Sequence, residues 1–135
     1  RIAFIHRFPW TGPVEDGGAL DHAANHLRRA GAEVVAVAMP DALDAGRDVL
    51  RTIMLAEAAR TLGPLQARER PRLSATLNAG LDEGRAISAD AYARAMVMRK
   101  SMIAAATHWL SAYDALMAPP APASAPEGLS TTGDP

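Results

Sequence analysis

Residues 20–39 read LDHAANHLRRAGAEVVAVAM, and this stretch decides the fold. From Leu20 to Leu27, apolar residues recur at helical spacing between polar and charged ones. Gly31 stands where a helix commonly ends in a left-handed turn, and the β-branched run after it is typical of a strand. The stretch therefore predicts a helix over 18–30 and a strand over 33–39.

A second apolar run lies before this helix. Residues 1–5 read RIAFI and predict a strand, which the proline- and glycine-containing segment 8–13 ends. Asp16 and Gly18 are alternative caps for the helix that follows. Strand, helix and strand within forty residues form a βαβ unit, whose two strands are parallel in one sheet. The fold class is therefore α/β.

The rest of the chain is predicted to be mainly helical. Asp44 is expected to cap a helix that the Gly-Pro pair at 63–64 ends. Ser88 is expected to cap the longest helix, with Asp90 paired to Arg94 in its first turns. The predicted elements are helices over 45–62, 72–83 and 89–113, a strand over 115–118, and a proline-rich loop or tail over 119–135. Residues 1–118 then form a partial α/β domain.

Composition excludes several classes of function. The 135 residues carry a net charge of −1, so the chain has no surplus of basic residues for nucleic acid. Cysteine is absent, which excludes disulfides, thiolate metal ligands and cysteine nucleophiles. No apolar run approaches the roughly 20 residues of a membrane helix, and no leader follows Arg1. We expect no nucleic-acid or membrane partner, a cytoplasmic location, and a chain cut from a longer protein.

Two histidines share a face of the first predicted helix. His22 and His26 are four residues apart, so both could reach one metal ion. Ala23 stands where an HExxH motif has its glutamate, and the pair lies away from the apolar stripe. The residues favour exposed histidines over a metal ligand pair, and we expect neither metal nor cofactor.

The residues alone assemble no catalytic constellation. Lys100 and Ser101 are adjacent, and neighbouring side chains on a helix point about 100° apart. A solvated helix face accounts for them better than a Ser–Lys pair. Arg99 interrupts the apolar stripe of the long helix, so we expect it, with Glu57 and Asp114, to be partly buried and paired.

Several segments, taken in their order along the chain, resemble segments of a known protein family. They are the strand at 1–5, LRRAGAEVV at 27–35, IMLAEAA at 53–59, GRAISADAY at 84–92, and YDALMAP at 113–119 followed by APEGL at 125–129 and TGDP at 132–135. Together these segments span essentially the whole chain. In this order they resemble the C-terminal half of an amidase of the amidase signature family.

The resemblance implies a larger mixed-sheet α/β/α fold and hydrolysis of carboxamides through a Ser–cis-Ser–Lys triad and an acyl-enzyme. The lysine and the Gly/Ser-rich signature of such enzymes lie before the part that this chain resembles. The chain therefore contains no catalytic residue and is expected to be inactive alone. Ala118-Pro119-Pro120 stands where the family often has Thr-Pro-Thr. The Asp-Gly-Val-Arg-Tyr-Gly passage of tRNA-dependent amidotransferase subunits is absent, which favours a general amidase.

The loop after the third predicted strand is the candidate for substrate contacts, because loops at strand ends usually supply them. The substrate-binding candidates are Ala118, Pro119, Pro120, Ala121 and Leu129. The expected partner of the whole enzyme is a small carboxamide.

The isolated chain is expected to form a homo-oligomer, because the rest of an amidase would otherwise cover its strand edges and apolar faces. Those faces include the side chains of Ile2, Phe4, Val35 and Val37. An alternative to the amidase interpretation is a stand-alone small α/β binding or interaction domain without catalytic activity.

Overall fold

A computed structural model of the protein describes residues 1–9, 18–121 and 127–128. The chain divides into two compact units. The first unit consists of residues 1–44 and 106–135, and the second consists of residues 45–105. The predicted division into a 1–118 domain and a 119–135 tail stays a prediction, because much of that tail lies outside the described residues.

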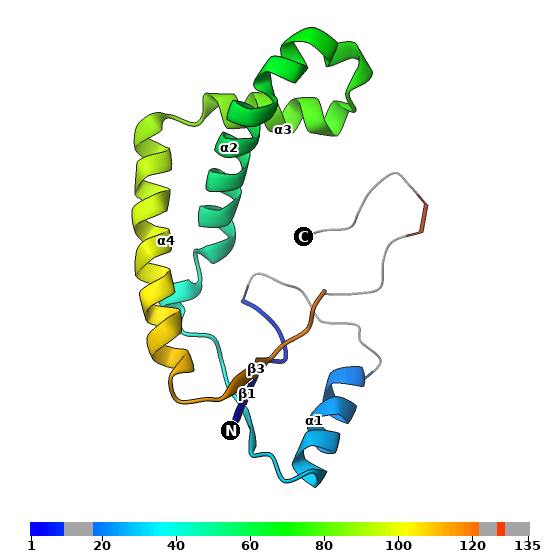
Figure 1. Ribbon diagram of the computed structural model, residues 1–135, viewed down its shortest axis with the longest axis vertical. Coiled ribbons are helices and arrows are strands. Elements are labelled where there is room, and N and C mark those ends of the chain that lie inside the picture. The colour runs from blue at the N-terminus through cyan, green and yellow to red at the C-terminus, as the bar shows by residue number, and fades with distance from the viewer. Residues whose placement is uncertain (10–17, 122–126, 129–135) are drawn as a thin grey trace. The chain divides into compact units, whose positions relative to one another are not determined.

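The first unit is built on a three-stranded parallel sheet (Figure 1). Its strands are β1 (Ile2–Phe4), β2 (Val34–Ala36) and β3 (Ala115–Met117), in the order β2-β1-β3. Ile2 is paired with Val34 on one side and with Ala115 on the other. The predicted βαβ unit and the third strand are confirmed. Each strand has only three residues, so the longer strands expected over 1–5, 33–39 and 115–118 are wrong in extent.

A glycine with a positive φ angle lies at each end of the first helix. α1 (Ala19–Arg29) follows Gly18, which has a φ of 80° and provides no side-chain cap. At the other end, Gly31 has a φ of 94°. Its N–H donates to the Arg28 carbonyl, and the Ala32 N–H donates to the Leu27 carbonyl, both at 3.0 Å. These two bonds form a Schellman motif, so the predicted left-handed end at Gly31 is confirmed.

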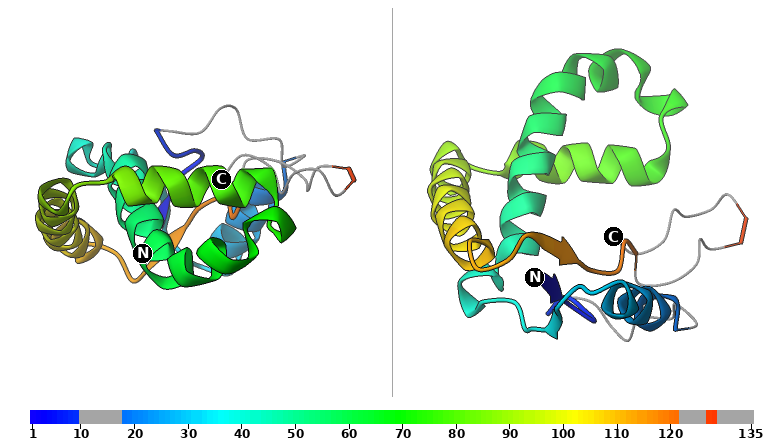
Figure 2. Two further views of the ribbon diagram at one scale, coloured as in Figure 1. Left: turned by 90° about the horizontal axis from the view of Figure 1, so that it is seen from above. Right: turned by 60° about the horizontal axis from the view of Figure 1, so that its bottom comes forward.

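α1 lies beside the sheet (Figure 2), and its apolar side chains pack against the sheet to make the core of the first unit. Phe4, Ala24 and Val34 are its buried residues, with Ile2, Leu20, Leu27, Ala32 and Met117 packed against them. Phe4 is 1% exposed, so the expectation that its side chain would be bared is wrong, because α1 packs over it. Ile2, Val35 and Val37 are half-buried.

The second unit is helical. It contains α2 (Gly46–Glu69), α3 (Ala75–Ala86) and the first part of α4 (Ala89–Leu110). Val49, Ile53 and Ala95 form a buried cluster, with Tyr92 and Met102 packed against it. α3 crosses α2 at very close range (Figure 1), because Gly84 presents no side chain to the backbone of Leu55.

The predicted cap and the predicted C-terminal end of the second helix are wrong, although the helix begins within one residue of the predicted position 45. Asp44 is not its cap, because Asp44 closes a short 3-10 turn (Asp41–Leu43) and α2 begins after Ala45. The Gly-Pro pair at 63–64 does not end it, because α2 continues through both residues to Glu69. Pro64 lacks the N–H of a helical bond, which costs about 3 kcal/mol in a helix interior. Contacts from the residues beyond Pro64 must offset this cost.

Those contacts come from a buried glutamine. Gln66 is 1% exposed, and its Nε2 donates to the Asn78 carbonyl at 3.2 Å and to Asp82 Oδ1 at 3.2 Å. Its Oε1 accepts from Arg85 Nη2. Arg70 Nη1 donates to Asp82 Oδ1 at 3.0 Å, and Nη2 donates to Oδ2. These bonds hold the last turns of α2 against α3 and keep them helical past the proline.

The two remaining helices begin at serine caps. Ser74 Oγ accepts from the Leu77 N–H at 3.2 Å, and Ser88 Oγ accepts from the Ala91 N–H at 3.1 Å. The predicted cap at Ser88 and the pair between Asp90 and Arg94 are both confirmed. α3 lies about three residues later than the predicted 72–83, and α4 ends three residues before the predicted 113.

Candidate functional site

The parallel sheet brings three loops to one edge. Because all three strands run in the same direction, the residues after Phe4, Ala36 and Met117 leave the sheet on the same side. In open parallel sheets, ligands bind beyond the carboxyl ends of the strands. This edge is therefore where a site in the first unit is expected.

A hollow of about 540 Å³ lies beyond the ends of β1 and β2. We call it the strand-end hollow. Its polar side chains are His6 and Arg7, which follow β1, and Asp41 and Asp44, which follow β2. The backbone and side chains of residues 36–39 and Pro9 complete its walls. The hollow thus offers cationic or donor groups from one loop and carboxylate acceptors from the other.

Packing orients the histidine of this hollow. The His6 ring lies 4.1 Å from the Phe4 ring, centroid to centroid, with 41° between their planes. Its Nδ1 lies 4.0 Å from Asp21 Oδ1 of α1. The backbone continues the ladder past both strands, because the Ile5 N–H donates to the Met117 carbonyl and the Val37 N–H donates to the Phe4 carbonyl, each at 2.9 Å. These bonds fix the chain directly before His6.

The predicted substrate-binding residues lie at the same edge of the sheet but do not line this hollow. Ala118, Pro119, Pro120 and Ala121 follow β3, whereas the strand-end hollow is formed by the loops after β1 and β2. Pro119 is buried, Ala118 is half-buried, and Pro120 and Ala121 are exposed. Leu129 lies outside the described residues. Their role in substrate binding stays a prediction.

Sequence reasoning missed His6, Arg7, Asp41 and Asp44. The signal that could have found them was available, since both predicted strands are followed within a few residues by charged or titratable side chains. Parallel strands bring their carboxyl ends to one edge, so these residues could have been placed together before the structure was known.

The expectation of partly buried charges is wrong, because Arg99, Glu57 and Asp114 are all exposed. Glu57 accepts from the Tyr92 hydroxyl at 2.8 Å, and this bond raises the pKa of Tyr92. The backbone N–H of Asp114 donates to the Arg1 carbonyl at 2.8 Å. The buried polar side chain of the described chain is Gln66, a neutral group that side chains and backbone can satisfy more easily than a charge.

The histidine pair and the Lys100–Ser101 pair that the sequence singled out lie on exposed helix faces, and three serines take part in hydrogen bonds at helix ends. His22 and His26 are both exposed on α1, as expected, and the described residues contain no cluster of three metal-ligating side chains. Lys100 and Ser101 are exposed on α4. Ser74 and Ser88 accept bonds from helix N-termini, and Ser111 donates to the His108 carbonyl at 2.6 Å.

No family model matches the chain, and no curated protein matches it significantly. Over residues 1–9, 18–121 and 127–128, no helix combines the length and hydropathy needed to cross a membrane.

Proposed function

We propose that this chain is the C-terminal portion of an amidase-type hydrolase that cleaves carboxamide C–N bonds through an acyl-enzyme. In the whole enzyme, residues 1–118 would belong to a larger mixed sheet in an α/β/α fold. The ordered resemblance of the segments supports this proposal. The structural observation on which the proposal depends is the set of hydrogen-bonding groups that line the strand-end hollow.

A primary carboxamide needs both kinds of hydrogen-bond partner, since its carbonyl accepts and its NH₂ group donates. Arg7 and the His6 ring can donate to the carbonyl, while Asp41 and Asp44 can accept from the NH₂ group. The apolar side chains of residues 37–39 suit a hydrocarbon substituent. We therefore assign carboxamide recognition to the strand-end hollow, with Ala118–Ala121 as a further wall in the whole enzyme.

The chemical step needs groups that this chain does not supply. In an amidase a serine oxygen attacks the amide carbon, the C–N bond breaks, the amine leaves with a proton, and water then releases the acid. The resemblance assigns the serine, its partner serine and the lysine to the preceding part of the enzyme. The isolated chain can therefore bind an amide but not hydrolyse it.

Ammonia release from aliphatic and aromatic carboxamides tests the absence of activity. We expect the isolated chain to match the buffer rate, and the Ser101→Ala variant to behave identically. Turnover that depends on Ser101 would contradict both the proposal and the assignment of Lys100 and Ser101 to a solvated helix face.

Binding is tested separately with benzamide, by following backbone amide NMR shifts during a titration. We expect saturable shifts at residues 6–7 and 37–44, and weaker binding after Arg7→Gln. Arg72→Gln is the matched control, because Arg72 is an exposed arginine of the second unit that pairs with Glu69. Unmoved signals around the hollow would rule out its assignment to carboxamide recognition.

The alternative function is a small α/β binding or interaction domain. One observation favours it, namely that residues of this chain alone line the strand-end hollow. The reading frame upstream of Arg1 separates the two proposals. A lysine followed by a Gly/Ser-rich segment would support the amidase, whereas a start codon directly before Arg1 would support the binding domain.

We also propose that the isolated chain associates with itself. β2 and β3 lie at the edges of the described sheet, and each presents a backbone edge that no described strand covers. In the second unit, Leu50, Met54 and Val97 are 64%, 53% and 67% exposed. Such edges and apolar side chains commonly pack against a second copy.

A further inference from the structure

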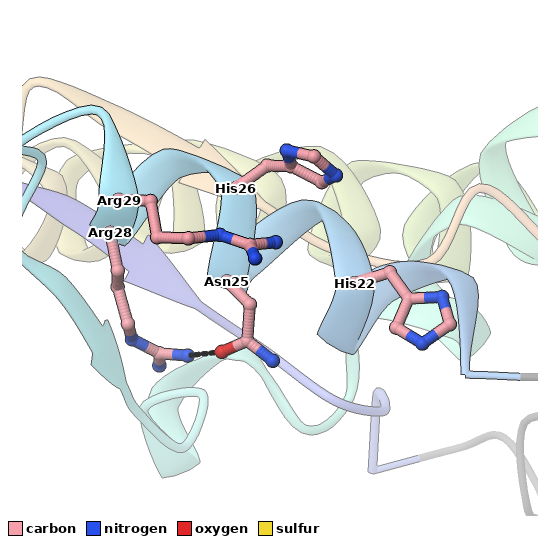
Figure 3. A pocket seen from close by; sticks show the side chains of 5 residues that line it. All are labelled: His22, Asn25, His26, Arg28 and Arg29. Atoms are coloured by element: carbon pink, nitrogen blue, oxygen red, sulfur yellow. Dashed lines mark hydrogen bonds between the residues drawn. The ribbon is translucent and has the colours of Figure 1, made fainter.

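The outer face of α1 carries a cluster of nitrogen-bearing side chains. His22, Asn25, His26 and Arg29 recur at intervals of three and four residues, which places them on one face of the helix. Together with Arg28 they line an open hollow of about 590 Å³ (Figure 3). We call it the α1 hollow. Among the described residues that line it, none is acidic.

Two hydrogen bonds hold Arg28 in this cluster. Its Nη1 donates to Asn25 Oδ1 at 3.0 Å, and its Nη2 donates to the Val34 carbonyl at 3.2 Å. Because the Asn25 oxygen faces Arg28, the NH₂ group of the same amide is left as a donor on the other side (Figure 3). Arg28 thus contributes charge and fixes the orientation of Asn25.

The side chain of Arg29 extends back along the helix, as long helical side chains do. Figure 3 shows its guanidinium reaching the level of Asn25 and His26 rather than projecting past the end of the helix. A guanidinium, an amide NH₂ and an imidazole are therefore presented together, with the His22 imidazole one turn before them.

Two simpler roles do not account for the whole cluster. Basic side chains in the last turn of a helix offset its dipole, which explains His26, Arg28 and Arg29 but not His22 or Asn25. A metal ion would find only two imidazoles here, and the two arginines would repel it. The shared property of the lining side chains is that each can donate a hydrogen bond.

We propose that the α1 hollow binds a phosphate group, either as free phosphate or carried by a small monoester. Phosphate oxygens accept several hydrogen bonds at once, and arginine matches them with two parallel donors. Arg29 supplies charged donors, and Asn25 and His26 supply further donors. Arg28 adds its charge while keeping its bonds to Asn25 and Val34. Because the hollow is open to solvent, binding is weak and weakens further with salt.

The test is a titration of the isotopically labelled chain with inorganic phosphate, and separately with glycerol 3-phosphate, at constant pH and ionic strength. We expect saturable NMR shifts at residues 22–29 with a dissociation constant in the millimolar range. Saturation with both probes supports a site for the phosphate group. Saturation with inorganic phosphate alone supports a site for the free ion.

Variants separate a site from general charge attraction. Arg29→Gln should weaken phosphate binding about tenfold, the effect of losing one charged hydrogen bond. His26→Gln is the second variant and should weaken binding less. Arg72→Gln removes one exposed positive charge from the second unit and should leave binding unchanged. Shifts that never saturate, or an equal loss in Arg72→Gln, would overturn the proposal, and neither outcome bears on the amidase.

Discussion

The contact between α2 and α3 makes Gly84 the most restrictive position that the structure reveals. A Cβ atom at Gly84 would lie 2.1 Å from the carbonyl oxygen of Leu55 and 2.6 Å from its carbonyl carbon. An ordinary carbon–oxygen contact is about 3.3 Å or more, so the Gly84→Ala substitution must separate the helices by about 1.2 Å. The obstacle is backbone in the middle of a helix, which cannot rotate away.

Gly80 provides the matched control. It lies one helical turn earlier on α3, and a Cβ atom there would meet only the Leu55 Cδ2 atom, at an ordinary 3.6 Å. Both Gly→Ala changes bring the same gain in helix propensity, about 1 kcal/mol. Gly80→Ala should therefore leave the protein equally stable or up to about 1 kcal/mol more stable.

In Gly84→Ala, the free energy lost from packing must exceed the same gain in helix propensity. Overpacking costs about 1 to 3 kcal/mol, and a gap of about 1 Å elsewhere along the contact forfeits up to half of the local dispersion energy. The bonds from Gln66 to Asn78 and Asp82 cross the same contact and would lengthen. We expect a net loss of about 2 kcal/mol for Gly84→Ala, so the two variants should differ by about 2 to 3 kcal/mol.

Urea denaturation followed by circular dichroism at 222 nm measures this difference directly, because α2 and α3 contribute much of the helix content. Comparing two variants of one residue type on one helix removes most effects on the unfolded state. If Gly84→Ala proves as stable as Gly80→Ala, the close crossing of α2 and α3 and the reasoning built on it are wrong.

Four further outcomes follow from the structure. Ser88→Ala should lower the free energy of unfolding by about 1 kcal/mol, since the helix loses a partner for its terminal N–H groups, and an unchanged denaturant midpoint would contradict the cap. Met102→Ala should cost about 2 kcal/mol, the low end for core methionines, because Met102 is half-buried, and no loss would mean that this face of α4 is solvated. The Arg70 guanidinium holds the pKa of Asp82 below its usual value, so their pair stabilises the protein above about pH 4 and this stabilisation is lost as the pH falls through the lowered pKa. Stability measured against pH should show Asp82→Asn weaker than the parent near neutrality and equal to it in acid, and a gap that persists in acid would contradict this account. Light scattering at several concentrations should show self-association of the isolated chain, and a monomer at every concentration would refute it.

Local sequence alone determined the order of the first three elements and two helix ends. The βαβ order, the Schellman end at Gly31 and the cap at Ser88 each depend on residues within a few positions of one another. Alternation, β-branching and capping chemistry act over that range, so they can be read without tertiary contacts.

The tertiary structure decided what depends on distant partners. Pro64 lies inside α2 because Gln66 and Arg70 bind residues of α3 that are 12 to 16 positions away. The buried polar side chain is the neutral Gln66, whose partners come from the crossing of α2 and α3, whereas the charged Arg99, Glu57 and Asp114 that were expected to be partly buried are exposed.

The candidate site shows the same limit. The sequence led to the loop at Ala118–Ala121, which does lie at the carboxyl edge of the sheet. Parallel pairing of the two predicted strands places the residues after them at one edge of the sheet, but the sequence does not show which of those residues line a common hollow. His6 and Asp41, which are 35 positions apart, do so because of the register of β1 and β2 and the course of the two loops. Chemistry within one segment can be read from the sequence, whereas a site built from two segments requires the register that joins them.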